Sequence, residues 1–186
     1  MFAPVDFTVR ALDPLTDSET VHRWVTRTRG SRLVDVEREC MAVAASEHRE
    51  AFLGLRDGTP AFLLERYDPR HSDELAGLYE PEPGDVGMRF LMPADDRPEH
   101  GCVRAVLTTI MEFLFADPAA ARVVVAEDDV SDTAAQDLHE LVGFEVVRET
   151  ERPEAPEAGV LLSFCTRSQF EAAAIRFAVL ERALAV

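Results

Sequence analysis

The chain has 186 residues, enough to bury a core, and we expect one domain spanning residues 1–186. Its 19 Lys and Arg residues against 35 Asp and Glu residues give a net charge of −16, which disfavours nucleic acid and anionic membranes as partners. Because the sequence has neither a long apolar run nor an amino-terminal signal pattern, we expect a cytoplasmic protein without a membrane span.

The first third of the chain predicts a strand followed by two helices. Val5–Arg10 alternates apolar and polar residues, as a half-buried strand does. A helix is expected from a cap at Thr16 or Asp17 to about Arg27, because both residue types favour caps and the helix dipole favours acidic residues in the first turn. Val34–Ala45 predicts a second helix, although its first residues also alternate as in a strand.

A hairpin and a loop are expected next. Glu50–Arg56 and Pro60–Tyr67 have the composition of strands, and the Asp57-Gly58 pair between them is a strong hairpin signal. The following segment, Asp68–Glu82, is rich in Asp, Pro, His and Glu. It predicts a surface loop with one helical turn.

The centre of the sequence alternates strands and helices. We expect strands over Val86–Met92 and Ala121–Glu127, with a helix over Gly101–Phe115 between them. A further helix over Ser131–Leu141, capped by Ser131 or Asp132, is expected to end at Gly143. A glycine turn that opens a helix after a strand offers unpaired N–H groups and the positive end of a dipole to a phosphate.

The carboxyl-terminal part predicts two strands and one long helix. The strands are Phe144–Glu149 and Ala158–Phe164, with a turn over Pro153–Glu157, and a Thr166/Gln169 capping box opens a helix over residues 166–186. The apolar stripe of this helix either docks on its own domain or forms a dimer contact, so we expect a monomer or a homodimer. The element order predicts an α+β fold, an α/β sandwich with a mostly antiparallel mixed central sheet flanked by helices.

Seven short segments between Pro60 and Phe164 share their order and spacing with one known family. In chain order these are Leu64–Tyr67, Asp73–Tyr79, Gly84–Leu91, Leu114–Pro118, Arg122–Val124, Glu127–Asp132 and Gly143-Phe144. The sequence resembles the GNAT acyltransferases, and within them the siderophore-biosynthesis N-acyltransferases of the aerobactin and mycobactin type, which acylate lysine or hydroxylysine side chains. The resemblance implies the GNAT fold with an extra carboxyl-terminal helix, acetyl-CoA or another acyl-CoA as co-substrate, and a small-molecule amine as acceptor.

The resemblance, read with the chemistry of acyl transfer, selects residues for binding the co-substrate. Backbone N–H groups at Leu91 and Met92 are expected to stabilise the thioester carbonyl, and the helix start is expected to bind the pyrophosphate. The co-substrate residues are therefore Leu91, Met92, Arg97, His100, Gly101, Cys102, Val103, Arg104 and Asp132. Arg97 and Arg104 add charge-assisted bonds to phosphate, or are ordinary surface arginines.

The acceptor side departs from the family pattern at its most informative position. Arg89 stands where the family has a histidine, and it cannot act as a base because arginine stays protonated. It is expected instead to bind a carboxylate or phosphate of the acceptor. Asp129 remains as the base or as the residue that orients the amine, so Asp129 and Arg89 are the candidate catalytic residues. Glu65, Asp85 and Tyr79 are the candidate acceptor-binding residues.

Other departures leave a second hypothesis open. Asp128 and Asp132 replace the proline and asparagine of the family's acidic motif, and Cys102-Val103 replaces smaller residues. A GNAT-like protein that binds a ligand or a partner without catalysis is the alternative, and an acyl carrier protein as acyl donor is a third possibility. We expect no metal site, because the three cysteines are far apart and odd in number and His71 and His139 stand alone. An Ala-, Arg- and Glu-rich composition suggests a bacterial source and a role in specialised metabolism.

Overall fold

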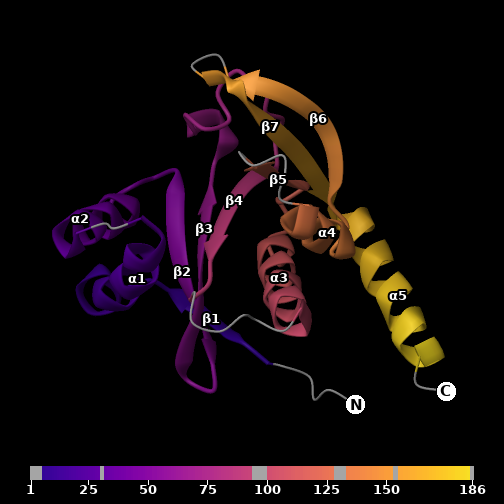
Figure 1. Cartoon of the computed structure of the whole chain (residues 1–186), viewed down its shortest axis with the longest axis horizontal. Helices are drawn as coiled ribbons and strands as arrows, with labels where there is room; N and C mark the ends of the chain where they lie inside the picture. The colour runs from indigo at the N-terminus through magenta and orange to yellow at the C-terminus, as the bar shows by residue number, and fades with distance from the viewer. Residues whose placement is uncertain (1–5, 30–31, 94–99, 128–132, 153–154, 185–186) are drawn as a thin grey trace. The chain divides into compact units, whose positions relative to one another are not determined.

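The computed structural model describes residues 6–29, 32–93, 100–127, 133–152 and 155–184 (Figure 1). Its strands form one seven-stranded sheet with the order β1-β2-β3-β4-β5-β7-β6. The strands are β1 (Thr8–Ala11), β2 (Arg49–Arg56), β3 (Thr59–Tyr67), β4 (Asp85–Leu91), β5 (Arg122–Glu127), β6 (Glu145–Arg152) and β7 (Ala155–Thr166). Because β4 and β5 pair in parallel and the pairs β1–β2, β2–β3, β5–β7 and β6–β7 are antiparallel, the predicted mostly antiparallel mixed sheet is confirmed.

Five α-helices flank the sheet in the described part of the chain. They are α1 (Pro14–Arg29), α2 (Leu33–Ala44), α3 (His100–Phe115), α4 (Thr133–Leu141) and α5 (Arg167–Leu184), and η1 (Pro69–His71) is a single 3-10 turn. None of the described helices is long and apolar enough to cross a membrane. The chain divides into two compact units, residues 1–67 with 88–102 and residues 68–87 with 103–186, so that β4 contributes to both.

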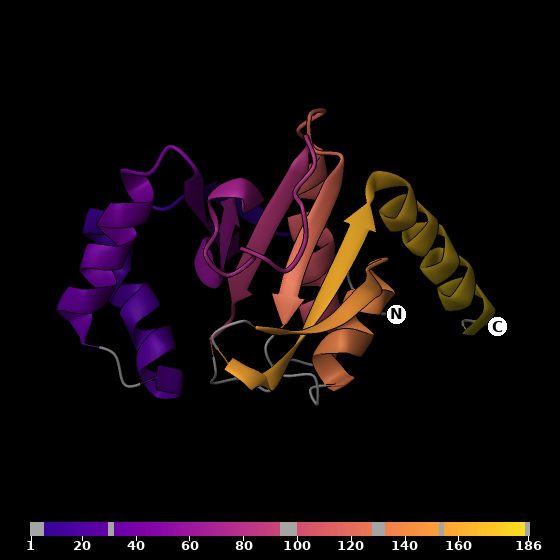
Figure 2. The same cartoon turned by 90° about the horizontal axis from the view of Figure 1, so that it is seen from above.

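The first unit packs α1 and α2 against strands of the sheet. The two helices lie side by side (Figures 1 and 2). Their buried residues Val21, Val36 and Cys40 form a core cluster with Leu12, Val25 and Leu63. Trp24 of α1 is also buried, at 8% exposure.

The predicted hairpin between β2 and β3 is confirmed. Asp57 and Gly58 have φ angles of 50° and 77°, the left-handed conformation that a two-residue hairpin turn requires. Antiparallel pairing then runs from Arg56 opposite Thr59 to Arg49 opposite Tyr67. A β-bulge at Gly54/Leu55 shifts this pairing by one residue, so the turn and the bulge together fix which residues of the two strands become neighbours.

The start of α1 differs from the prediction. The helix begins at Pro14, and the Oδ1 atom of Asp13 accepts a hydrogen bond from the backbone N–H of Leu15 at 3.0 Å. Asp17 is not the cap, because it lies inside the helix. Its carboxylate accepts from the backbone N–H of Asp13 at 2.9 Å and from Arg10 at 2.6 and 2.8 Å. These bonds lower the pKa of Asp17 from its ordinary value, against the opposing effect of burial.

The second unit is built around α3 and the long β6–β7 pair. Five side chains of α3 are at most 1% exposed: Val106, Leu107, Ile110, Met111 and Leu114. Gly143 ends the turn after α4 with a φ angle of 101°, as predicted, and a Cβ atom there would lie 2.7 Å from the backbone oxygen of Gln169. The predicted cap residues of α4, Ser131 and Asp132, lie outside the described residues.

Two predicted loops are more ordered than expected. Within Asp68–Glu82, Leu75 and Leu78 are only 1% exposed, and the Nη1 atom of Arg148 donates to the backbone oxygen of Leu78 at 3.0 Å. This segment is therefore anchored by its two leucines and is not a plain surface loop. The turn expected over Pro153–Glu157 is shorter than predicted, because β7 already begins at Ala155.

Helix α5 is docked through its first half. The predicted capping box is confirmed, since the Oε1 atom of Gln169 accepts from the backbone N–H of Thr166 at 2.7 Å and Thr166 Oγ1 accepts from the backbone N–H of Gln169 at 3.3 Å. Arg167 donates to the backbone oxygen atoms of Phe115 and Asp117, which ties the helix start to the end of α3. Beyond Ala173, which is buried, the apolar side chains Ile175, Val179 and Leu180 are exposed.

Candidate active site

The first unit contains a cavity of about 480 Å³ beside the end of β4. Its walls come from α1, α2 and the strands β2, β3 and β4. Most of the lining is apolar: Leu12, Val21, Val25, Val36, Cys40, Val43, Ala51, Leu63, Phe90 and Leu91. The charged residues of the lining are Asp35, Glu39, Arg49, Glu65 and Arg89. Apolar walls with a few convergent polar groups are typical of a small-molecule site.

Four of the five charged residues in the lining are joined by hydrogen bonds. The Oε1 atom of Glu65 accepts from Arg49 Nε at 2.6 Å and from Arg89 Nη2 at 3.2 Å. Arg49 also donates through Nη2 to Glu39 at 2.6 Å. The bond to Glu65 is the largest cause that raises the pKa of Arg49 above its ordinary value. The structure thus brings together two predicted residues, Arg89 and Glu65, around one that sequence reasoning missed, Arg49.

The register of the hairpin explains how Arg49 reaches Glu65. Arg49 lies opposite Tyr67, two residues along β3 from Glu65, and such diagonal neighbours are within reach of long side chains. Tyr67 itself lies near Arg89, whose guanidinium carbon is 5.5 Å from the centre of its ring. The turn at Asp57-Gly58 alone would place Arg49 opposite Arg66 and direct Glu65 to the other face of the sheet. The bulge at Gly54/Leu55 shifts the register by one residue and brings Arg49 and Glu65 together.

The other two predicted acceptor residues, Asp85 and Tyr79, lie in the second unit around Arg122. Asp85 accepts from Arg122 Nε at 2.8 Å and from Nη2 at 2.7 Å, and its side chain is 2% exposed. The guanidinium carbon lies 4.2 Å from the ring centre of Phe164 and 6.0 Å from that of Tyr79. Arg122 is therefore enclosed by a buried carboxylate and two aromatic rings, and this arrangement stabilises the second unit.

The residues expected to bind the co-substrate follow from the end of β4 to the start of α3. Leu91 ends β4 and lines the cavity, Met92 comes next, and α3 begins at His100 with no acidic residue in its first turn. The absence of a carboxylate there suits a helix start that faces phosphate. Cys102 and Val103 are partly buried, and at His100 and Gly101 the backbone alone is described. Arg97, Asp129 and Asp132 lie outside the described residues.

Arg104, one turn into α3, contacts the carboxyl-terminal helix. Its guanidinium carbon lies 3.0 Å from the ring centre of Phe177 in α5. Arg122 makes a similar stacking contact with Phe164 in the same unit. The arginine proposed for phosphate is therefore held in place by an aromatic ring.

The sequence profile of a family described as an acetyltransferase (GNAT) domain matches residues 13–152, three quarters of the chain. The chain belongs to the GNAT acetyltransferase family. Membership makes this GNAT domain an N-acyltransferase of amines that uses acyl-coenzyme A as acyl donor. The matched range includes every cavity-lining residue except Leu12, and it includes Tyr79, Asp85 and Arg122 but not Phe164.

Solved structures share the fold of this GNAT domain. An uncharacterized protein from Bacillus halodurans is similar with a TM-score of 0.78 and 22% identity, covering 90% of this chain and 87% of the other. The aminoglycoside acetyltransferase AAC(6')-Ib, in complex with ribostamycin and coenzyme A, is similar with a TM-score of 0.76 and 21% identity, covering 89% and 96%. A spermidine N-acetyltransferase SpeG chimera from Vibrio cholerae and hSSAT is similar with a TM-score of 0.67 and 12% identity, covering 88% of this chain and 97% of the other. No curated protein sequence matches the chain.

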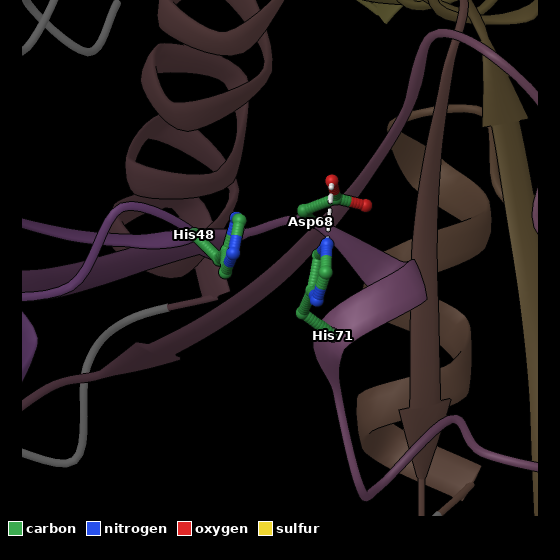
Figure 3. Close-up of side chains that lie close together, drawn as sticks. All are labelled: His48, Asp68 and His71. Carbon is green, nitrogen blue, oxygen red and sulfur yellow. Dashed lines mark ion pairs between the residues drawn. The ribbon is translucent and has the colours of Figure 1, made fainter.

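The two histidines singled out in the sequence have different surroundings in this GNAT domain. His139 of α4 is buried, its Nδ1 atom lies 2.5 Å from Glu127 Oε1, and its ring is 5.1 Å from that of Phe144, which supports a structural role. His71 lies in η1 with about half of its side chain exposed, 4.0 Å from Asp68 (Figure 3). Asp68 also accepts from Arg70, which lowers the pKa of Asp68.

Proposed function

We propose that this GNAT domain transfers an acyl group, acetyl in the simplest case, to an amine or hydroxylamine of a small amino-acid-derived metabolite. The supporting observation is the cavity beside β4, which is largely apolar and presents Arg89 and Glu65. A siderophore intermediate of bacterial specialised metabolism, made in the cytoplasm, is the acceptor that the sequence resemblance favours. We propose that it acts as a monomer or as a homodimer.

The proposed reaction is direct transfer in a ternary complex. The amine nitrogen attacks the thioester carbonyl carbon, the carbon–sulfur bond breaks, and coenzyme A leaves as a thiolate that takes up a proton. In this proposal the backbone N–H groups at Leu91 and Met92 stabilise the developing negative charge on the carbonyl oxygen. The pyrophosphate binds at the start of α3, with Arg97, Arg104 and Asp132 contributing.

The proton of the attacking amine needs an acceptor other than Arg89. An arginine side chain stays charged at neutral pH, so Arg89 orients the acceptor while Asp129, directly or through water, takes the proton. Glu65 contributes to acceptor binding through its bonds to Arg49 and Arg89. Asp85 and Tyr79 hold Arg122 within the second unit.

Binding and turnover test the proposal in two steps. Calorimetry with acetyl-coenzyme A should show saturable binding, and mass spectrometry of an amine panel should show an acylated product. Asp129→Asn should lower kcat by at least about a hundredfold, in the range of a lost general base, while Asp137→Asn on the exposed face of α4 serves as the matched control. Unchanged turnover in Asp129→Asn would remove Asp129 from the mechanism, and binding without turnover of any amine would favour the non-catalytic alternative.

A further inference from the structure

We infer that the acceptor is an amine with an apolar body and one carboxylate, held at the cavity by Arg89 with Arg49 and Glu65 as positioning residues. This inference rests on the proposed function and names its substrate class. It also separates this protein from the structures similar to it whose names specify polycations, the aminoglycosides and spermidine.

The walls of the cavity select an apolar body. Val21 and Val25 of α1, Val36 and Val43 of α2 and Leu63 of β3 line a volume of about 480 Å³, which suits a small molecule. A hydroxyl-rich or polyamine chain would leave polar groups without partners against these side chains, and each such group costs about 1 to 3 kcal/mol. An aliphatic or aromatic chain meets no such cost.

The charges at the cavity favour an anion over a second cation. Each of the three carboxylates in the lining already accepts from an arginine: Asp35 from Arg32, Glu39 from Arg49, and the Oε1 atom of Glu65 from Arg49 and Arg89, at 2.6 and 3.2 Å. An ammonium group that approached Glu65 would compete with both arginines and would be repelled by them. A carboxylate meets the opposite situation, because guanidinium groups bind carboxylates through strong, directional hydrogen bonds.

The arrangement of the two arginines assigns them different roles. Arg49 is held at both ends of its guanidinium, by Glu65 at 2.6 Å and by Glu39 at 2.6 Å, and its side chain is 30% exposed. Arg89 makes the longer bond to Glu65 and its side chain is 45% exposed. Arg49 therefore fixes Glu65, Glu65 orients Arg89, and Arg89 presents its charge to a ligand in the cavity.

The overall charge of the protein is compatible with such a ligand. A net charge of −16 repels free anions over a long range and attracts polycations. An amine that also carries one carboxylate is a zwitterion with no net charge, so it is not repelled. Its carboxylate then responds to the local guanidinium field, because surface charges farther away than the Debye length of about 8 Å are screened.

A matched acceptor panel tests the inference with the full chain and acetyl-coenzyme A. The panel holds ω-aminohexanoate, hexylamine, diaminohexane and aminohexylphosphonate, which share the amine and the six-carbon body and differ at the far end. We expect kcat/KM, measured by mass spectrometry of the product, to be at least about tenfold higher for the aminocarboxylate than for the other three, through a lower KM. Equal or better use of hexylamine or diaminohexane overturns the inference, and preference for the phosphonate overturns the carboxylate assignment.

Two variants and a control connect the preference to the cavity. In Arg89→Gln and in Arg49→Gln the kcat/KM ratio between aminohexanoate and hexylamine should fall towards one. Arg66→Gln is the control, because Arg66 makes a comparable cross-strand ion pair with Glu50 but does not line the cavity, and it should keep the ratio. A ratio that persists in both cavity variants overturns the role of the arginines.

Direct binding separates a failure of this inference from a failure of the proposed function. Calorimetry of aminohexanoate against hexylamine needs no acyl donor and no turnover. Preferential binding of aminohexanoate that is lost in Arg89→Gln supports the inference even if no amine is acylated, in which case the proposed function fails alone. If amines are acylated but neither binding nor kcat/KM favours the aminocarboxylate, the proposed function stands and this inference fails.

Discussion

Each unit contains an arginine–carboxylate pair, and the two pairs differ in how far the arginine is enclosed. Arg122 and Asp85 form two parallel hydrogen bonds at 2.8 and 2.7 Å, and phenyl and phenol rings cover the guanidinium. Arg89 and Glu65 make one bond at 3.2 Å beside a cavity, with the arginine side chain 45% exposed. The closed pair encloses its guanidinium between a carboxylate and aromatic rings, whereas the open pair places a partly exposed guanidinium in the lining of a cavity. Pair geometry thus separates a structural ion pair from a binding one.

The comparison is sharpest when the same change is made in both pairs. Asp85→Asn should lower the free energy of unfolding by about 3 kcal/mol, because the mostly buried Arg122 loses its enclosed counter-charge and keeps only the exposed Glu82, 3.7 Å away. Glu65→Gln should cost only about 1 kcal/mol, because its arginines reach solvent and the amide oxygen still accepts a hydrogen bond. Urea denaturation of the two variants measures both values. Equal losses would contradict the distinction between a closed and an open pair.

A third pair, Arg10–Asp17, lies between these extremes and responds to pH. Asp17 is mostly buried while Arg10 is 43% exposed, and the hydrogen bonds from Arg10 lower the pKa of Asp17. A carboxyl whose pKa is lowered by folding stabilises the fold above its ordinary pKa, and this contribution is lost as the pH falls through the lowered value. Asp17→Asn should therefore be less stable than the parent by about 1 kcal/mol at neutral pH.

That stability difference should shrink below about pH 4, which is close to the ordinary pKa of an aspartate side chain. Thermal unfolding followed by circular dichroism between neutral and acidic pH measures it. Glu19→Gln, an exposed change in the same helix, is the control and should show no such convergence. A difference that stays constant down to acidic pH would show that the hydrogen bonds, and not the charge of Asp17, carry the effect.

The smallest expected effect concerns the cysteines, which lie in both units. Burial raises the pKa of Cys165 to about 12 and also raises that of Cys40, whereas Cys102 is only partly buried. At about pH 8 the thiolate fraction of Cys165 is on the order of one part in ten thousand, so iodoacetamide should modify Cys102 first. Mass spectrometry of the labelled peptides after a short reaction measures this order.

The same labelling in increasing urea compares the two units directly. Cys40 belongs to the first unit and Cys165 to the second. If both become reactive at the same urea concentration, the units unfold cooperatively as the predicted single domain would. Separate midpoints would show that each unit has its own stability.

Local signals in the sequence predicted most of the fold. The Asp57-Gly58 turn, the Thr166/Gln169 capping box and the turn at Gly143 all depend on residues a few positions apart, and the structure contains each of them. The start of α1 was predicted at the wrong residue because Asp17 bonds to Arg10, a partner in the preceding strand. Residue preferences alone could not distinguish that ion pair from a cap.

The candidate site was harder to predict because its contacts are distant in the chain. Asp85 and Arg122 are 37 positions apart, and Glu65 and Arg89 are 24 positions apart, so no local pattern shows which carboxylate is enclosed. The buried Leu75 and Leu78 were missed for a similar reason, since the polar residues around them dominate the composition of that segment. Arg49 was missed because its approach to Glu65 depends on a one-residue bulge between β2 and β3, which the turn residues do not show.

The fluorescence of Trp24 can report on the cavity of the first unit. Trp24 is the one tryptophan in the sequence, it lies buried in α1, and its helix neighbours Val21 and Val25 line the cavity. Indole emission on selective excitation therefore originates from the first unit, while the second unit contributes no tryptophan signal. A red shift of that emission reports the opening of the cavity wall to water, and a change on adding an acceptor reports occupancy of the cavity, without any label attached to the protein.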